Sequence, residues 1–114
     1  MKLPKAARIR RRRDFLAVQE GGARLYTGEV LVLSRGAGAD RARIGITVSS
    51  KVANAVGRNR VKRLVRQAFR EIEAELPPVD LVVIARAGAL TMGLAGARRA
   101  LAAARDRLAA GRVP

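Results

Sequence analysis

The sequence predicts one α+β domain, in which helices pack against a single mixed sheet in the order αβββαβα. The 114 residues, 49% of them hydrophobic, are enough for one small core, and no repeat or long linker divides the chain. Apolar residues recur at helical spacing in residues 54–75 and 94–108. Short apolar or alternating runs bounded by Gly and Pro fill much of the rest and predict strands.

The first half of the chain predicts a helix and a pair of strands. Residues 1–13, MKLPKAARIRRRR, predict a basic arm that is flexible when the protein is alone. Residues 14–20 predict a short helix, with Asp14 as N-cap and Gly21 and Gly22 as its stop. Residues 25–35 predict one or two strands broken near Thr27 and Gly28, and GAGAD at 36–40 predicts a loop.

The second half continues with strand, helix, strand and helix. Residues 43–51 alternate strictly and predict a strand with its apolar side chains on one face. Residues 54–75 predict a helix that ends before Pro77 and Pro78. The apolar run 80–85 predicts a strand, and the 3–4 spacing of Leu94 to Leu108 predicts a last helix ending at Gly111.

The charge balance predicts a polyanionic partner. The chain carries 24 Lys and Arg against 9 Asp and Glu, a formal net charge of +15. An Arg-rich surface without a partner is the plainer alternative. A membrane partner is disfavoured, because the sequence has no 18-residue apolar run, signal peptide or lipidation motif. Cysteine and histidine are absent, which excludes disulfides and imidazole catalysis and favours a cytoplasmic protein.

Residues 58–70 form the strongest candidate site. No acid occurs there, and like charges recur at i,i+4, so a free helix would repel itself and a bound polyanion would relieve the repulsion. The basic residues are Arg58, Arg60, Lys62, Arg63, Arg66 and Arg70, with Asn59 among them. The apolar stripe consists of Val61, Leu64, Val65, Ala68, Phe69 and Ile72. Arginine forks match phosphate oxygens in bidentate fashion, which favours nucleic acid.

A second candidate is the polar face of the alternating strand, formed by Gly45, Thr47, Ser49 and Lys51. Small side chains leave room for an extended nucleic-acid strand, although a merely solvated face is the alternative. Residues suited to catalysis are sparse. Glu71 and Glu75 are most simply ion-pair partners at a helix end, and Ser49 has no histidine to activate it. We therefore expect no catalytic residues and no metal ligands in the protein.

The segment SSKVANAVGRNRVKRLVRQAFR resembles the signature of the bacterial ribonuclease P protein component. The Arg-rich start, Arg13-Asp14-Phe15 and DLVVIAR after the signature agree with it, so the resemblance spans nearly the whole chain. It implies one domain over residues 1–114, ribosomal-protein-S5-like. It also implies a left-handed βαβ crossover through the basic helix, against the usual right-handed rule.

The resemblance also implies a function. The protein would be the subunit of an endoribonuclease, ribonuclease P, whose RNA subunit, with magnesium, removes the 5′ leader from precursor tRNA, and it would be inactive alone. The residues implied to bind the catalytic RNA are Arg58, Asn59, Arg60, Lys62, Arg63, Arg66 and Arg70. Those implied to bind the leader are Phe15, Leu33, Thr47, Ser49 and Lys51. Neither DNA nor a membrane is an expected partner.

The chain departs from the family at four positions. Gln19 and Leu33 stand where groove aromatics are frequent, Ser50 precedes Lys51 where Lys-Lys is usual, and Ala53 replaces a Gly. Leader binding would therefore depend more on backbone contacts than on base stacking. Phe15 has a second interpretation as a core anchor. A structural RNA-binding protein, such as a small ribosomal protein, shares the charge and size, and a DNA-binding protein is the third class, without helix-turn-helix spacing to support it.

Overall fold

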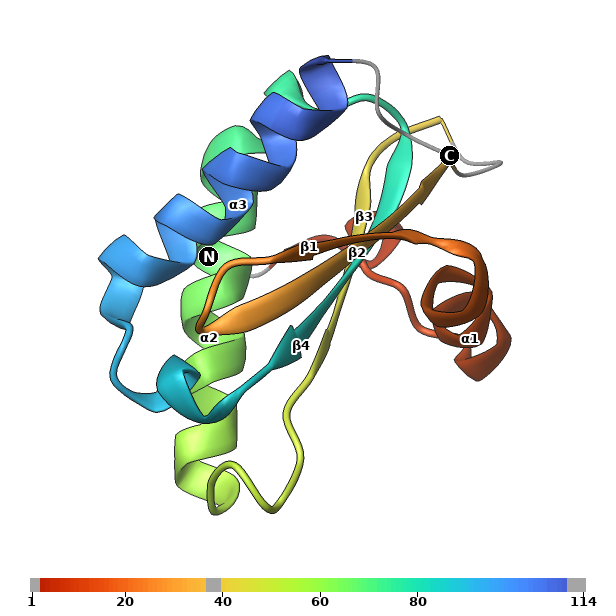
Figure 1. The fold of residues 1–114 in the computed structure, drawn as a ribbon. Coiled ribbons are helices and arrows are strands. Elements are labelled where there is room, and N and C mark those ends of the chain that lie inside the picture. The colour runs from red at the N-terminus through yellow and green to blue at the C-terminus, as the bar shows by residue number, and fades with distance from the viewer. Residues whose placement is uncertain (1–2, 37–39, 111–114) are drawn as a thin grey trace.

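The computed structural model describes residues 3–36 and 40–110. Its elements are α1 (Arg12–Gly21), β1 (Ala23–Tyr26), β2 (Val30–Gly36), β3 (Arg43–Thr47), α2 (Ala55–Ile72), β4 (Val79–Ala85) and α3 (Gly93–Ala109). The predicted α+β class and the order αβββαβα are therefore confirmed (Figure 1). Within the described ranges, no helix has the length and apolar content that crossing a membrane requires.

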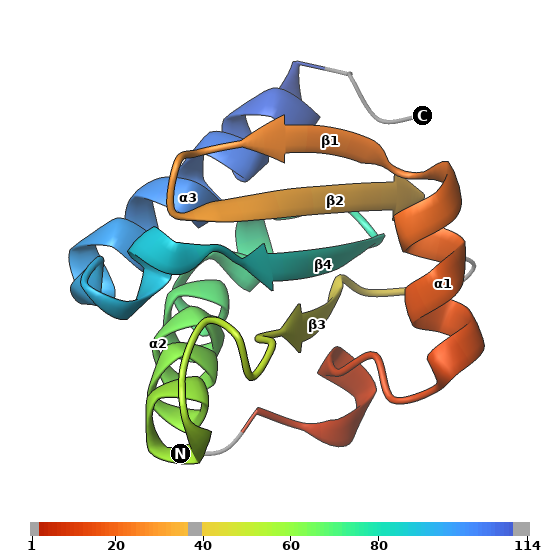
Figure 2. The same ribbon diagram turned by 60° about the horizontal axis from the view of Figure 1, so that its bottom comes forward.

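The four strands form one mixed sheet in the order β1-β2-β4-β3. β1 pairs with β2, and β2 with β4, in antiparallel fashion, whereas β3 and β4 are parallel neighbours joined through α2. In Figure 2, α1 lies on the near side of the sheet and α2 connects β3 to β4 on the far side. With α2 on that side, the crossover from β3 to β4 is left-handed, as the resemblance implies. The helices α1 and α2 therefore cover opposite faces of the sheet.

Each face of the sheet has its own core, because successive side chains of a strand point to opposite faces. The larger core packs α2 and α3 against Val30, Val32, Ile44, Leu81 and Val83. The smaller core lies under α1 and contains Ile9, Val18, Leu31, Leu33 and Val82, with Phe15 and Ile84 packed against it. β4 contributes to both cores, which explains its nearly continuous apolar sequence.

The basic helix α2 forms where the sequence predicts. The Asn54 side chain accepts a hydrogen bond from the Gly57 N–H at 2.9 Å, which caps the first turn. The predicted apolar stripe faces the core. Val61, Val65, Ala68 and Phe69 are buried, and Leu64 and Ile72 are partly buried beside them. Residues 73–75, predicted as helix, form a separate 3₁₀ turn.

The N-terminal segment is packed and not flexible over its described part, residues 3–13. Leu3, Ala7 and Ile9 are buried. The Ile9 N–H donates to the Ile44 oxygen at 2.9 Å, so the segment covers the free edge of β3. The physical reason is the three apolar side chains spaced among the basic ones, which the charge count of residues 1–13 obscured.

Two boundary predictions are wrong. The strand predicted over residues 43–51 ends at Thr47, because Thr47 pairs with Ile84 near the end of β4 and no partner continues beyond it. Residues 49–52 instead form a turn closed by the Val52 N–H and the Ser49 oxygen, 3.0 Å apart. Asp14 is not the N-cap of α1, which begins at Arg12. The loop predicted at 36–40 lies partly, and the end at Gly111 wholly, outside the described residues.

Candidate nucleic-acid interface

The solvent side of α2 carries uncompensated positive charge. Asn59, Arg60, Arg63 and Arg66 are exposed, whereas Arg58, Lys62 and Arg70 are partly buried. The acid of α2 that forms an ion pair, Glu71, binds Arg98 of α3 through two hydrogen bonds of 2.8 Å. Among the described residues, the basic side chains from position 58 to 66 take part in no ion pair. This face is therefore available to an anion.

The first turn of α2 gives Arg58 a second role. One of its guanidinium nitrogens donates to the Ala53 oxygen at 2.9 Å, and its backbone N–H donates to the Asn54 oxygen at 2.9 Å. A side chain at Gly57 would approach the Ala53 Cβ to 2.9 Å, so this position requires glycine. Part of the Asn-Ala-Val-Gly-Arg string is thus explained by helix initiation. Arg60 is exposed, whereas Arg58 is partly buried, so Arg60 is more accessible to a ligand.

The face of the sheet that carries α1 is only partly covered by that helix. Leu33, Val82 and Gly45 lie side by side in the strand register and pack with α1 residues. The next row beyond them consists of Tyr26, Leu31, Ile84 and Thr47. The two ends of this row, Tyr26 and Thr47, are exposed, whereas Ile84 is partly buried and Leu31 is 9% exposed. We call this row, with its two accessible ends, the open strip beside α1.

The five predicted leader-binding residues have different environments. Leu33 is 1% exposed beneath α1 and belongs to the core, because β2 points it into the smaller cluster. Phe15 is partly buried, and its ring packs over Gly45, where an added Cβ would lie 2.6 Å from two ring carbons. Thr47 is exposed at the end of β3. Ser49 and Lys51 are exposed but lie in the turn after the strand.

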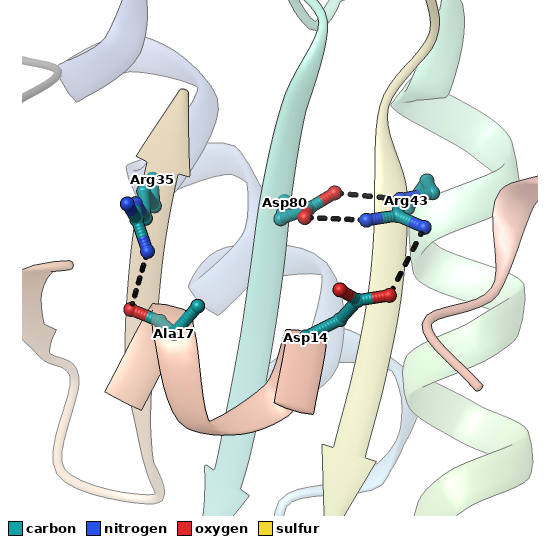
Figure 3. Close-up of polar contacts among 5 residues, drawn as sticks. All are labelled: Asp14, Ala17, Arg35, Arg43 and Asp80. Atoms are coloured by element: carbon teal, nitrogen blue, oxygen red, sulfur yellow. Dashed lines mark hydrogen bonds and ion pairs between the residues drawn. The ribbon is translucent and has the colours of Figure 1, made fainter. Parts of the chain in front are cut away.

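Two polar contacts join α1 to the sheet, next to an ion pair within the sheet itself (Figure 3). Arg43 donates to both Asp80 carboxylate oxygens, at 2.8 and 2.7 Å, and lies 3.7 Å from the Asp14 carboxylate of α1. Arg35 donates to the Ala17 oxygen at 3.1 Å. The hydrogen bonds to Asp80 raise the pKa of Arg43 further above its ordinary value, against a smaller opposing effect of burial. This network fixes the position of Phe15 relative to the open strip.

Tyr26 and Arg86 are site candidates that the sequence reasoning missed. Tyr26 is 60% exposed, and the Arg86 guanidinium carbon lies 5.6 Å from the centre of its ring. The available signal was the alternation of residues 23–26, which places Tyr26 opposite the core-facing Leu25. An exposed aromatic at this end of the strip supplies a stacking surface that the groove positions Gln19 and Leu33 do not.

Six of the nine acidic side chains pair with arginines. Ion pairs engage Asp14, Glu71, Glu73, Glu75, Asp80 and Asp106. Within residues 3–36 and 40–110, no three His, Cys, Asp or Glu side chains gather in a way that would hold a metal ion. The exposed arginines of α2 are the described groups whose chemistry suits phosphate oxygens.

Residues 3–109 match the family model described as ribonuclease P. A ribonuclease P protein component from Shouchella clausii is 48% identical over 86 residues, which are 74% of this chain and 70% of that protein. The corresponding protein of Citrifermentans bemidjiense is 39% identical over 105 residues, covering 92% and 90% of the two chains.

Solved structures agree with the sequence matches. The RNase P protein of Staphylococcus aureus superposes with a TM-score of 0.80 at 31% identity, covering 96% of this chain and 98% of that one. The RNase P protein of Thermotoga maritima superposes with a TM-score of 0.77 at 35% identity, covering 88% and 96%. The likeness thus extends over the α1 and α2 surfaces alike.

Proposed function

This chain belongs to the ribonuclease P protein family and so is a protein subunit of the endoribonuclease of tRNA 5′ processing, and we propose that its two surfaces divide the RNA contacts. The basic face of α2 binds the catalytic RNA. The open strip beside α1 binds the leader of precursor tRNA. Of the three function classes that the sequence left open, the family match selects this one.

The observation that carries the proposal is the unpaired charge on α2. The exposed Arg60, Arg63 and Arg66 have no acidic partner among the described residues, whereas six acids of the chain pair with other arginines. Counterions therefore accompany this face until RNA phosphates displace them, which makes binding strongly salt-dependent. Asn59 lies among them and adds an amide that both donates and accepts.

Arg60→Ala tests the α2 assignment. Loss of one charge-assisted phosphate contact costs about 1–3 kcal/mol, so the Kd for the RNA subunit should rise by roughly 5- to 150-fold. Arg107→Ala, an exposed arginine on α3, is the matched control and should leave the Kd nearly unchanged. Both variants should keep the wild-type circular dichroism spectrum. Equal RNA affinity for Arg60→Ala and wild type, at one fixed salt concentration, would contradict the assignment.

On the leader surface, Thr47 and Tyr26 bound the open strip, and Phe15, Ser49 and Lys51 lie around it. Leu33 contributes only by packing beneath α1. The strip spans four strands spaced about 4.8 Å apart, so an extended strand of a few nucleotides covers it. Tyr26 presents an exposed ring for a base at one end, and Lys51 a charge near the other end.

Precursor and mature tRNA together test the leader surface. Tyr26→Ala and Lys51→Ala should weaken binding of precursor tRNA to the holoenzyme and leave mature tRNA, which lacks a leader, nearly unaffected. Stacking on an aromatic side chain is worth about 1–3 kcal/mol per base, and Tyr26→Phe should retain most of it. An equal loss for both ligands would show that the residues contact the tRNA body or the catalytic RNA.

We assign hydrolysis to the RNA subunit, with magnesium bound mainly by RNA. Six of the nine acids pair with arginines, as in the Asp80–Arg43 pair, and the described acids form no cluster suited to a metal ion. Purified protein with precursor tRNA and magnesium should therefore leave the substrate intact, and addition of the RNA subunit should release the leader. Correct 5′ cleavage by the protein alone would overturn this part. A cytoplasmic place of action follows from the substrate.

A further inference from the structure

A cavity of about 780 Å³ lies between the N-terminal segment and the outer side of α2. Its lining residues are Leu3, Arg8, Arg63, Arg66, Gln67, Arg70 and Glu71. The volume is within the roughly 300–1,000 Å³ range of ligand-sized sites. Four of the seven lining side chains are arginines, so the cavity suits an anion. The N-terminal segment therefore adds a wall to the α2 surface.

Arg8 is the distinctive member of this lining. Its backbone N–H donates to the Lys5 oxygen at 3.1 Å, and the residue bridges to Ile44 of β3, so its position is fixed. Its Nε is shielded from solvent and has no hydrogen-bond partner among the described residues. A buried charged donor without a partner is unfavourable. An acceptor supplied from outside the chain would remove that unfavourable state.

The other charges of the cavity also favour an anion. Arg63 and Arg66 are exposed and have no ion pair among the described residues. Glu71 is the acid in the lining, and both of its carboxylate oxygens accept hydrogen bonds from Arg98. These hydrogen bonds lower the pKa of Glu71, so it stays ionised but is neutralised by its partner. The net charge that a ligand meets is positive.

We propose that this cavity binds the phosphodiester backbone of the RNA subunit, with Arg8 donating its buried Nε–H to a phosphate oxygen. The inference rests on the proposed role of α2 and extends it to the N-terminal segment. Arg8 from one side, and Arg63 and Arg66 from the other, hold the backbone between them. Guanidinium groups on two walls fix the path of a phosphate chain more closely than one helix face does.

Three variants test the role of Arg8 in RNA-subunit binding. Arg8→Ala should weaken binding about 10-fold and reduce the slope of log K against log salt by about one. Arg8→Lys keeps the charge but lacks the fork, and should recover only part of the affinity. Arg10→Ala removes an exposed charge of the same segment outside the cavity, and should change the Kd less than 2-fold. Equal effects of Arg8→Ala and Arg10→Ala would overturn the proposal.

A double-mutant cycle guards against a folding artefact. Arg8→Ala and Arg66→Ala, on opposite walls, should lose less RNA affinity together than the product of their separate losses. Arg8→Ala combined with Arg60→Ala, which lies outside the lining, should give simple multiplication of the two losses. Multiplication in both cycles would show that Arg8 and Arg66 share no ligand. Inorganic pyrophosphate added to the wild type should shift the Arg8 Nε–H resonance, and absence of a shift would count against the site.

The measurements distinguish the α2 assignment from the cavity assignment. If Arg60→Ala weakens RNA-subunit binding but Arg8→Ala does not, the cavity inference is wrong and the α2 assignment stands. If neither variant weakens binding, both are wrong. If Arg8→Ala leaves the RNA subunit bound normally and weakens only precursor tRNA on the holoenzyme, the phosphates belong to the substrate and the assignment to the RNA subunit is wrong.

Discussion

The buried ion pair between Arg43 of β3 and Asp80 of β4 should contribute strongly to the stability of the fold, and Asp80→Ala tests this. Arg43 donates to both carboxylate oxygens, at 2.8 and 2.7 Å, and Asp80 is 8% exposed. Removal of the Asp80 carboxylate leaves the partly buried Arg43 with one ion-pair partner, the Asp14 carboxylate at 3.7 Å.

The expected loss follows from burial. Removal of one partner of a fully buried pair costs about 3–5 kcal/mol, and because the Arg43 side chain is 24% exposed we expect about 2–3 kcal/mol. At about 2.1 cal/mol/K per residue, each kcal/mol lowers the Tm of the 114-residue chain by roughly 4 °C. Asp80→Ala should therefore lower the Tm by about 8–13 °C.

The chain offers a matched control of the same geometry. Arg98 donates to both carboxylate oxygens of Glu71 at 2.8 Å, but this pair is exposed on α2 and α3. Exposed pairs contribute little, so Glu71→Ala should leave the Tm nearly unchanged. Thermal unfolding followed by circular dichroism compares the two. Equal Tm changes for Asp80→Ala and Glu71→Ala would refute the argument that burial decides the strength of the pair.

Three further outcomes are expected. Phe69→Ala removes a fully buried ring from the larger core and should cost about 3–5 kcal/mol in urea unfolding; a loss below 1 kcal/mol would contradict this placement. Gly45→Ala brings a Cβ within 2.6 Å of the Phe15 ring, so it should destabilise the fold by about 1–3 kcal/mol. It should also weaken precursor tRNA binding more than mature tRNA binding. Unchanged stability and unchanged binding would contradict the packing of Phe15 on β3. The hydrogen bond from Arg98 lowers the pKa of Glu71, so the small contribution of this pair is present above the ordinary carboxylate pKa and disappears as pH falls through the lowered value. In an NMR titration, Arg98→Ala should therefore raise the pKa of Glu71, and an unchanged titration would contradict the pairing.

The sequence was sufficient for the order of elements and for α2. The 3–4 spacing from Val61 to Ile72 identifies the buried stripe, and the same spacing puts Arg60, Arg63 and Arg66 in solvent. Periodicity determines these features because a helix presents its faces by geometry alone. The signature string likewise identified the family, which the comparisons confirm.

The sequence alone did not predict burial or strand length where these depend on contacts between residues far apart in the chain. Leu33 and Tyr26 both lie on the α1 side of the sheet, but only the position of α1 makes one buried and the other exposed. β3 ends at Thr47 because its partner β4 ends, and alternation within residues 43–51 carries no information about the length of the partner. The hand of the crossover also came from resemblance and not from periodicity.

The N-terminal segment shows the same division between local and tertiary information. Its charge alone predicted a flexible arm, since five arginines in residues 8–13 repel one another when unpacked. The apolar residues Leu3, Ala7 and Ile9 can be buried only because β3 has a free edge and a groove lies beside α2. Composition predicted a polyanionic partner for this protein. Tertiary packing decided that Arg8 faces α2 across a cavity, because a contact between residues more than fifty positions apart has no local signature.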